Sequence, residues 1–303
     1  MAQAHTVAAF YQFAPLSDLA ALQDSLRGLC AAEHLRGTIL LAPEGINGTV
    51  SGPKPGTEAL LARLRDIPGC QDLSAKISVT DRPPFHRMKV RLKQEIVTMG
   101  DAEIDPTVRV GEYVAPEDWN EIIRDPNTVV IDTRNDYEVR VGTFAGALNP
   151  DIATFRDFPR WVKEHLDPAV HSRIAMFCTG GIRCEKATSL LLREGFESVR
   201  HLHGGILNYL RQIPEADSQW RGECFVFDQR VALNHDLAPG EHSLCFGCQE
   251  PLSPEELDHP DYEPSVCCSR CASSTSPELR ARRRERARQV ALAEGRGERH
   301  VGW

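Results

Sequence analysis

The residues with the clearest chemical potential are a cysteine and an arginine at the two ends of a short loop. Cys178 and Arg183 enclose four residues, and Cys184 follows directly; the enclosed residues are Thr179, Gly180, Gly181 and Ile182. An apolar run before the loop predicts a buried strand end, and the segment after it predicts a helix. Backbone N–H groups and the positive helix end then face the cysteine and favour its thiolate. Arg183 adds a fixed positive charge, so we expect a nucleophilic sulfur.

This loop resembles the active-site loop of rhodanese domains, which has the pattern Cys-x-x-Gly-x-Arg followed by a helix. Cysteine phosphatases place five residues between nucleophile and arginine, whereas Cys184 occupies that arginine position here. The smaller loop suits sulfur or another small group better than a phosphoester. The alternative is a buried, inert cysteine at a strand end. Two glycines and an arginine at this spacing favour the reactive interpretation.

The composition indicates a cytoplasmic protein with reduced thiols. The chain has 303 residues, enough for two domains and a small third unit. Its start lacks a basic segment and a long apolar run, and no stretch is apolar enough for a membrane span, so we expect neither a signal peptide nor a membrane partner. Ten cysteines in this setting suggest catalysis and metal binding rather than disulfides. The net charge of −8 argues against a uniformly basic surface but allows local basic patches.

Residues 1–99 are expected to form a ferredoxin-like (acylphosphatase-like) α+β domain. Two helical patterns, one of them capped by Ser17, alternate with four strand patterns in the order β-α-β-β-α-β. The strands are expected at 7–13, 37–42, 46–52 and 76–80, and the helices at 18–33 and 57–66. Leucine stripes on both helices indicate core packing rather than a cofactor site.

A basic segment follows the fourth expected strand and continues as an extended stretch over 88–97. Alternation places four positive charges on one face, at Arg87, Lys89, Arg91 and Lys93. With Phe85 nearby for stacking on a base, this pattern fits contact with an RNA backbone. The alternative is an edge strand whose charges prevent edge-to-edge pairing. The sequence does not separate the two interpretations.

Beyond a linker at 100–106, residues 107–213 are expected to form a rhodanese-like domain with a parallel sheet covered by helices on both faces. Asp132 and Arg134, then Glu138 and the glycines of 142–147, follow the rhodanese order. We expect Asp132 and Arg134 to stabilise the loops as part of a charged network. The reactive loop then lies beyond the carboxyl end of a central strand, the usual ligand position in such sheets.

Residues 214–303 form a different kind of unit, a cysteine-rich extension. Two Cys-x-x-Cys pairs are nineteen residues apart, which predicts a structural zinc site with the ligands Cys245, Cys248, Cys268 and Cys271. Cys267 is an alternative to Cys268, and free cysteines or a redox pair are the alternatives to zinc. Ser276 and Pro277 then open an arginine-rich helix, which either contacts RNA phosphates or is a disordered tail.

Over nearly its whole length the chain resembles the rhodanese-domain tRNA uridine(34) 5-hydroxylases. The resemblance rests on residues 37–49, on 90–97 and, most specifically, on 178–187. It implies that tRNA is the partner and that wobble uridine 34 is converted to 5-hydroxyuridine with molecular oxygen. It also places Cys178 at the family's reactive cysteine, described by rhodanese analogy as a persulfide intermediate.

The residues leave the mechanism open. Cys178 either adds to C6 of the uracil ring and makes C5 electron-rich, or an oxidised Cys178 delivers oxygen and Cys184 resolves it. The sequence contains no flavin or haem motif and no clear iron site, and the electron donor is unknown. Two other classes are a rhodanese-type sulfurtransferase that carries a cysteine persulfide and a non-enzymatic RNA-binding or zinc scaffold.

Overall fold

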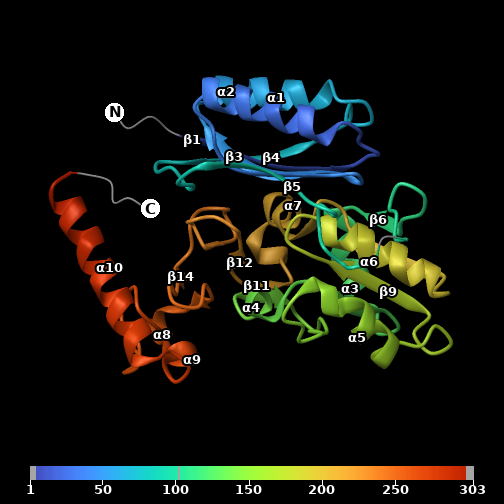
Figure 1. Ribbon diagram of the computed structural model, residues 1–303. Helices are drawn as coiled ribbons and strands as arrows, with labels where there is room; N and C mark the ends of the chain where they lie inside the picture. The colour runs from blue at the N-terminus through green and yellow to red at the C-terminus, as the bar shows by residue number, and fades with distance from the viewer. Residues whose placement is uncertain (1–4, 102, 298–303) are drawn as a thin grey trace.

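The structure is a computed structural model that describes residues 5–101 and 103–297. Figure 1 shows an N-terminal unit with two helices above a sheet, a central α/β unit below that sheet, and a C-terminal extension beside them. The three parts follow one another along the chain. A site that uses residues of more than one part must lie where those parts meet.

The N-terminal sheet has the strand order of the expected ferredoxin-like fold, with one addition. The order is β4-β1-β3-β2-β5, where β5 lies at the edge and runs parallel to β2. The elements are β1 (His5–Phe13), α1 (Leu19–Ala32), β2 (Arg36–Ala42), β3 (Gly45–Gly52), α2 (Lys54–Arg65), β4 (Ala75–Thr80) and β5 (Met88–Leu92). The basic segment is therefore an edge strand that ends at Leu92, shorter than the expected extended stretch. The helix α1 is capped by Asp18 in a left-handed conformation, so the expectation of Ser17 was wrong.

Alternation along these strands gives the sheet two different faces. Ala8 and Phe10 in β1 pack with Leu26 of α1 and Leu60 of α2 in one core. The residues between them point away from the helices, because successive side chains of a strand alternate between faces. Figure 1 shows that this second face is turned toward the central unit.

The central unit is a parallel sheet with helices on both faces, which confirms the expected rhodanese-like architecture. Its strand order is β6-β10-β9-β7. The elements are β6 (Glu112–Val114), α3 (Pro116–Arg124), β7 (Val129–Asp132), α4 (Asp136–Val139), β8 (Gly142–Phe144), η1 (Phe155–Asp157), α5 (Phe158–His165), β9 (Arg173–Phe177), α6 (Ile182–Arg193), β10 (Ser198–Leu202) and α7 (Gly205–Gln212). One core lies under α5 and α6, and a second lies under α3 and α7.

The extension consists of short hairpins and ends in a long helix. Its first strand, β11, pairs with β8 of the central unit. The elements are η2 (Glu215–Asp217), β11 (Trp220–Gly222), β12 (Cys224–Phe225), β13 (Ala232–Leu233), β14 (Ser243–Leu244), β15 (Pro251–Leu252), α8 (Pro254–Leu257), α9 (Ser269–Ala272) and α10 (Pro277–Gly295). The arginine-rich segment is thus helical. Across the described residues we find no helix with the length and apolar character that crossing a membrane requires.

Candidate active site and metal site

The reactive loop connects β9 to α6, as its sequence predicts. Gly181 has a φ of 108°, a conformation that side chains rarely adopt, and its N–H donates to the Cys178 sulfur at 3.1 Å. The start of α7 supports the loop from below, because the N–H of Ile206 donates to the Cys178 carbonyl at 2.9 Å. A side chain at Gly205 would collide with that same carbonyl oxygen. The loop is therefore fixed by backbone contacts from two elements.

The two cysteines of the loop differ in protonation. Burial alone would raise the pKa of Cys178, but a hydrogen bond from Cys184, the charge of Arg183 and the N–H groups of Cys184 and Gly181 hold it well below its usual value. Burial and the neighbouring Cys178 thiolate raise the pKa of Cys184 well above its usual value. The two shifts have opposite directions and favour Cys178 as the thiolate and Cys184 as the thiol that donates to it.

Arg183 is fixed by a buried carboxylate. Its guanidinium donates to both oxygens of Glu138, at 2.5 and 2.8 Å, and to the hydroxyl of Thr179 at 3.3 Å. Glu138 is fully buried and also accepts from the backbone N–H of Asn135. Burial alone would raise the pKa of Glu138, but Arg183 keeps it below its usual value. This bidentate pair fixes the arginine beside the sulfur.

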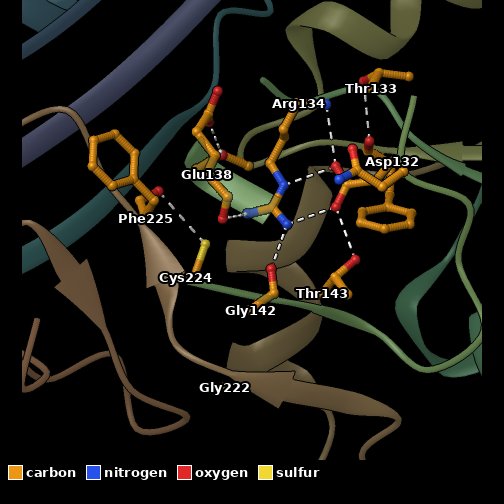
Figure 2. Close-up of polar contacts among 12 residues, drawn as sticks. Asp132, Thr133, Arg134, Glu138, Gly142, Thr143, Gly222, Cys224 and Phe225 are labelled. Atoms are coloured by element: carbon orange, nitrogen blue, oxygen red, sulfur yellow. Dashed lines mark hydrogen bonds and ion pairs between the residues drawn. The ribbon is translucent and has the colours of Figure 1, made fainter. Parts of the chain in front are cut away.

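A second buried ion pair lies beneath the first. Arg134 donates to both carboxylate oxygens of Asp132, at 2.8 and 2.6 Å, and both side chains are fully buried (Figure 2). Arg134 also donates to the carbonyls of Gly142 and Glu138, at 2.5 and 3.3 Å. Through Glu138 this pair is linked to Arg183. The network supports the loop, in line with the structural role expected for Asp132 and Arg134.

The N-terminal unit contributes two side chains to the reactive loop. Lys76 of β4 donates to the carbonyl of Gly180 at 2.7 Å, and Tyr11 of β1 donates to Glu185 of α6 at 2.7 Å. Burial lowers the pKa of Lys76 to about 8, although the Cys178 thiolate acts in the opposite direction. The sequence analysis did not single out Lys76, Tyr11 or Glu185. For Lys76 and Tyr11, the available signal was their position on the strand face that points away from α1 and α2.

A buried lysine joins the two units nearby. Lys186 of α6 is fully buried, and its ammonium lies 2.7 Å from a carboxylate oxygen of Glu44 and 2.7 Å from one of Glu95. Glu44 also accepts from the N–H of Ile96 at 2.6 Å. Because both carboxylates belong to the N-terminal segment, this cluster fixes that segment over the reactive loop. Under this cover Cys178 has an exposed fraction of 0%.

The four basic residues in and next to β5 lie in two settings. Arg87 and Lys89 line a groove of about 1050 Å³ between the N-terminal sheet and the extension, whereas Arg91 and Lys93 are exposed outside it. The groove also contains Arg283 and Arg286 of α10. Two of the four predicted RNA-binding residues are therefore joined by arginines that lie about two hundred residues further along the chain.

The four predicted metal ligands come together in the extension. The sulfur atoms of Cys245, Cys248, Cys268 and Cys271 all lie within 4.8 Å of one another. Three of the pairs are 3.7 to 3.9 Å apart. Four sulfurs at ~2.3 Å from one tetrahedral ion would lie ~3.8 Å apart, so the spacing fits a bound ion. Cys267 lies outside this set, and its thiol donates to the carbonyl of Asp261 at 3.6 Å.

Known protein families match both the N-terminal unit and the central unit. A UPF0176 acylphosphatase like domain matches residues 5–96, and a rhodanese-like domain matches residues 115–212. Among solved structures, the rhodanese-like domain of an Anabaena protein is 19% identical, covers 36% of this chain and 78% of its own, and has a TM-score of 0.31.

Curated relatives match almost the whole chain. A tRNA uridine(34) hydroxylase from Ruegeria pomeroyi is 54% identical over 98% of this chain and 99% of its own. One of the same name from Brucella anthropi is 53% identical over 98% of both chains.

Proposed function

The chain belongs to the tRNA uridine(34) hydroxylase family, and from this premise we propose that it hydroxylates uridine 34 of tRNA. It is accordingly an oxidoreductase. The observation that carries the proposal is the near-full-length identity of 54%, which includes the extension as well as the two matched domains. The product is 5-hydroxyuridine, and molecular oxygen is the co-substrate. We propose a cytoplasmic location, which a tRNA substrate and ten free cysteines support.

Cys178 is the catalytic residue in this proposal. Its thiolate adds to C6 of the uracil ring, and the electron pair of the C5–C6 double bond moves into the ring and its O4 carbonyl. C5 thereby becomes electron-rich and takes a hydroxyl group from molecular oxygen, whose second oxygen atom is reduced to water by an external two-electron donor, a small molecule or a protein. Loss of the C5 proton and of the Cys178 sulfur from C6 then restores the double bond. The low pKa of Cys178 supports the nucleophile, and Arg183 supports the developing negative charge.

The other predicted site residues either bind the tRNA or stabilise the extension. The four basic side chains Arg87, Lys89, Arg91 and Lys93 contact tRNA phosphates, in agreement with their exposed or half-exposed positions on β5. A zinc ion held by Cys245, Cys248, Cys268 and Cys271 closes the extension and has a structural role, because all four ligands are thiolates. We propose a domain division at 1–99, 107–213 and 214–303, which the matches over residues 5–96 and 115–212 support.

The test is mass spectrometry of tRNA nucleosides from cells that lack this gene. Complementation with the wild type should restore 5-hydroxyuridine and its derivatives, and complementation with Cys178→Ala should not. Cys70→Ala serves as the matched control, because it removes a buried thiol of the N-terminal core that lies outside the reactive loop. If the deletion leaves 5-hydroxyuridine unchanged even when any redundant pathway is also deleted, the hydroxylase proposal is wrong. Full restoration by Cys178→Ala would instead remove the assigned role of that residue.

The rhodanese-type loop supports one second candidate, transfer of sulfur through a Cys178 persulfide. The short spacing of Cys178 and Arg183 suits that chemistry. A cyanide-dependent release of sulfur from thiosulfate that is indifferent to tRNA would favour it over hydroxylation.

A further inference from the structure

The groove and the reactive loop are joined by one row of residues on the open face of the N-terminal sheet. Strand register places five residues side by side across all five strands. In order from the edge they are Lys89, Thr38, Thr49, Ala9 and Lys76, and we call this row the sheet lane. Four strand spacings of ~4.8 Å give it a length of ~19 Å.

One end of the sheet lane lies at the groove, and the other end lies at the reactive loop. Lys89 and Thr38 line the groove of about 1050 Å³, and Lys76 donates to the carbonyl of Gly180 in the reactive loop. All five residues are half-buried, and they alternate with core residues that face α1 and α2. The sheet lane therefore leads from the groove to Cys178 along the face that looks toward the central unit (Figure 1).

Neighbouring contacts bound the sheet lane on both sides. On one side Arg230 of the extension donates to the hydroxyl of Ser78 at 2.8 Å, and the adjacent Val7 and Ser51 are buried. On the other side Asn47 donates to the carbonyl of Ile96 at 2.9 Å. Between them the floor consists of two threonines and an alanine, whose side chains are small and half-buried.

The groove has the charge and the aromatic surface of a site for single-stranded nucleic acid. Its lining has four arginines and lysines and one acidic residue, Asp228, in a chain whose net charge is −8. Asp228 is paired with Arg230 at 2.5 Å, so the groove keeps a positive balance. Phe227 is 62% exposed and packs edge-on against Phe225, whose ring also contacts Tyr137. Stacking of bases on such rings combines with phosphate contacts when proteins bind unpaired strands.

We propose that an unpaired RNA strand lies in the groove and crosses the sheet lane, which carries the target base to Cys178. This inference rests on the proposed function and specifies the path of its substrate. The groove residues hold nucleotides beside the target, and Lys89 and Lys76 contact phosphates at the two ends. At ~3.4 Å per stacked nucleotide, about six nucleotides span the sheet lane, which is the scale of an anticodon loop.

The first test fills the sheet lane without changing its charge. Thr49→Phe adds a ring at the middle of the floor, and Val79→Phe adds the same ring at an exposed position on the other face of the sheet. We expect Thr49→Phe to lower tRNA hydroxylation on the order of 100-fold, because the base stops short of the sulfur. Iodoacetamide should still alkylate Cys178 at the wild-type rate. Val79→Phe should hydroxylate normally.

The second test removes one charge from the groove. Lys89→Gln should weaken binding of an anticodon stem-loop RNA, measured by fluorescence anisotropy, and reduce the salt dependence by about 0.7 in log–log slope for each lost phosphate contact. Lys54→Gln, at an exposed site on α2, should change neither quantity.

These outcomes separate the two proposals. An inactive wild-type enzyme would refute the proposed function, whereas an active wild type with an equally active, folded Thr49→Phe variant would refute the sheet lane alone. If Thr49→Phe does not fold, RNA carrying 4-thiouridine beside the target can be crosslinked to the wild type by light. Crosslinks to residues 36–49 and 225–229 support the path, and crosslinks confined to α1 and α2 overturn it.

Discussion

At the scale of single residues, the contrast between the two loop sulfurs decides the chemistry. The Cys184 thiol and the Arg183 charge together make Cys178 the anionic sulfur of the loop. Neither effect requires a partner from outside the chain. The lowered pKa of Cys178 therefore does not depend on a bound substrate.

Removal of the thiol donor should make Cys178 less acidic. In Cys184→Ala the hydrogen bond to the Cys178 sulfur is lost, so the pKa of Cys178 should rise. The measurement is the pH dependence of iodoacetamide alkylation, followed on the peptide that contains Cys178. Cys70→Ala, which removes a buried thiol in the N-terminal core, is the control and should leave the midpoint unchanged. An unshifted midpoint in Cys184→Ala would show that the Cys184 thiol does not influence the pKa of Cys178.

Lys76 should make hydroxylation depend on pH. Burial lowers its pKa to about 8, so the ammonium is present below pH 8 and is lost as the pH rises through that value. We expect kcat/KM to fall across the same range, because the positive charge beside the reactive loop disappears. Lys76→Arg keeps its charge throughout, and its profile should be flat there. Identical profiles for wild type and Lys76→Arg would assign the decline to another group.

At the scale of elements, the long helix of the extension is attached to the cluster of four cysteines that could hold a metal ion. Arg283 of α10 donates to the carbonyls of Val266 and Gly247, at 2.9 and 2.7 Å. It thereby attaches the long helix to the two Cys-x-x-Cys segments, which we call the knuckles. The arginine therefore has a structural role as well as a position in the groove. A change in the knuckles can reach the groove through this contact and through Phe246 and Gln249, which line the groove.

Loss of one cysteine ligand should release the ion and should also detach α10 from the knuckles. Cys248→Ser is expected to abolish stoichiometric zinc in elemental analysis and to make α10 sensitive to limited proteolysis. Cys267→Ser should retain zinc, because its sulfur lies outside the cluster. Zinc retained by Cys248→Ser and lost by Cys267→Ser would reassign the ligand set.

Helices and strands were predictable from the sequence where residues close together in the chain determine them. Periodicity and turn residues located the ferredoxin-like strand order and the parallel sheet, and cysteine spacing located the metal cluster. The contributions of Lys76 and Tyr11 were not predictable, because they arise only when two separately folded sheets dock. The groove was not predictable for the same reason: Arg87 and Arg286 are distant in sequence, and no periodicity relates them.

At the scale of the whole molecule, docking of the N-terminal unit rests on a buried charge cluster. Lys186 is fully buried between Glu44 and Glu95, whose side chains are 22% and 13% exposed. Removal of the lysine alone leaves two carboxylates without a counter-charge. Such a change is costly even when the intact pair adds little net stability.

Lys186→Met should therefore destabilise the protein by about 3 kcal/mol in urea unfolding. The comparison variant is Lys54→Met, which breaks an exposed pair with Glu58 and should cost less than about 0.5 kcal/mol. Addition of Glu44→Gln to Lys186→Met should recover part of the loss. Equal stability of the two lysine variants would mean that the cluster does not connect the units.

The complete enclosure of Cys178 has a consequence for how strongly tRNA binds. A base reaches the sulfur only in the fraction of molecules whose N-terminal unit has opened, so the observed dissociation constant is the intrinsic one divided by that fraction. Tyr11→Phe removes the hydrogen bond to Glu185 that helps keep the units together. This variant should consequently bind tRNA more tightly than the wild type, since a change that weakens the closed form enlarges the open population.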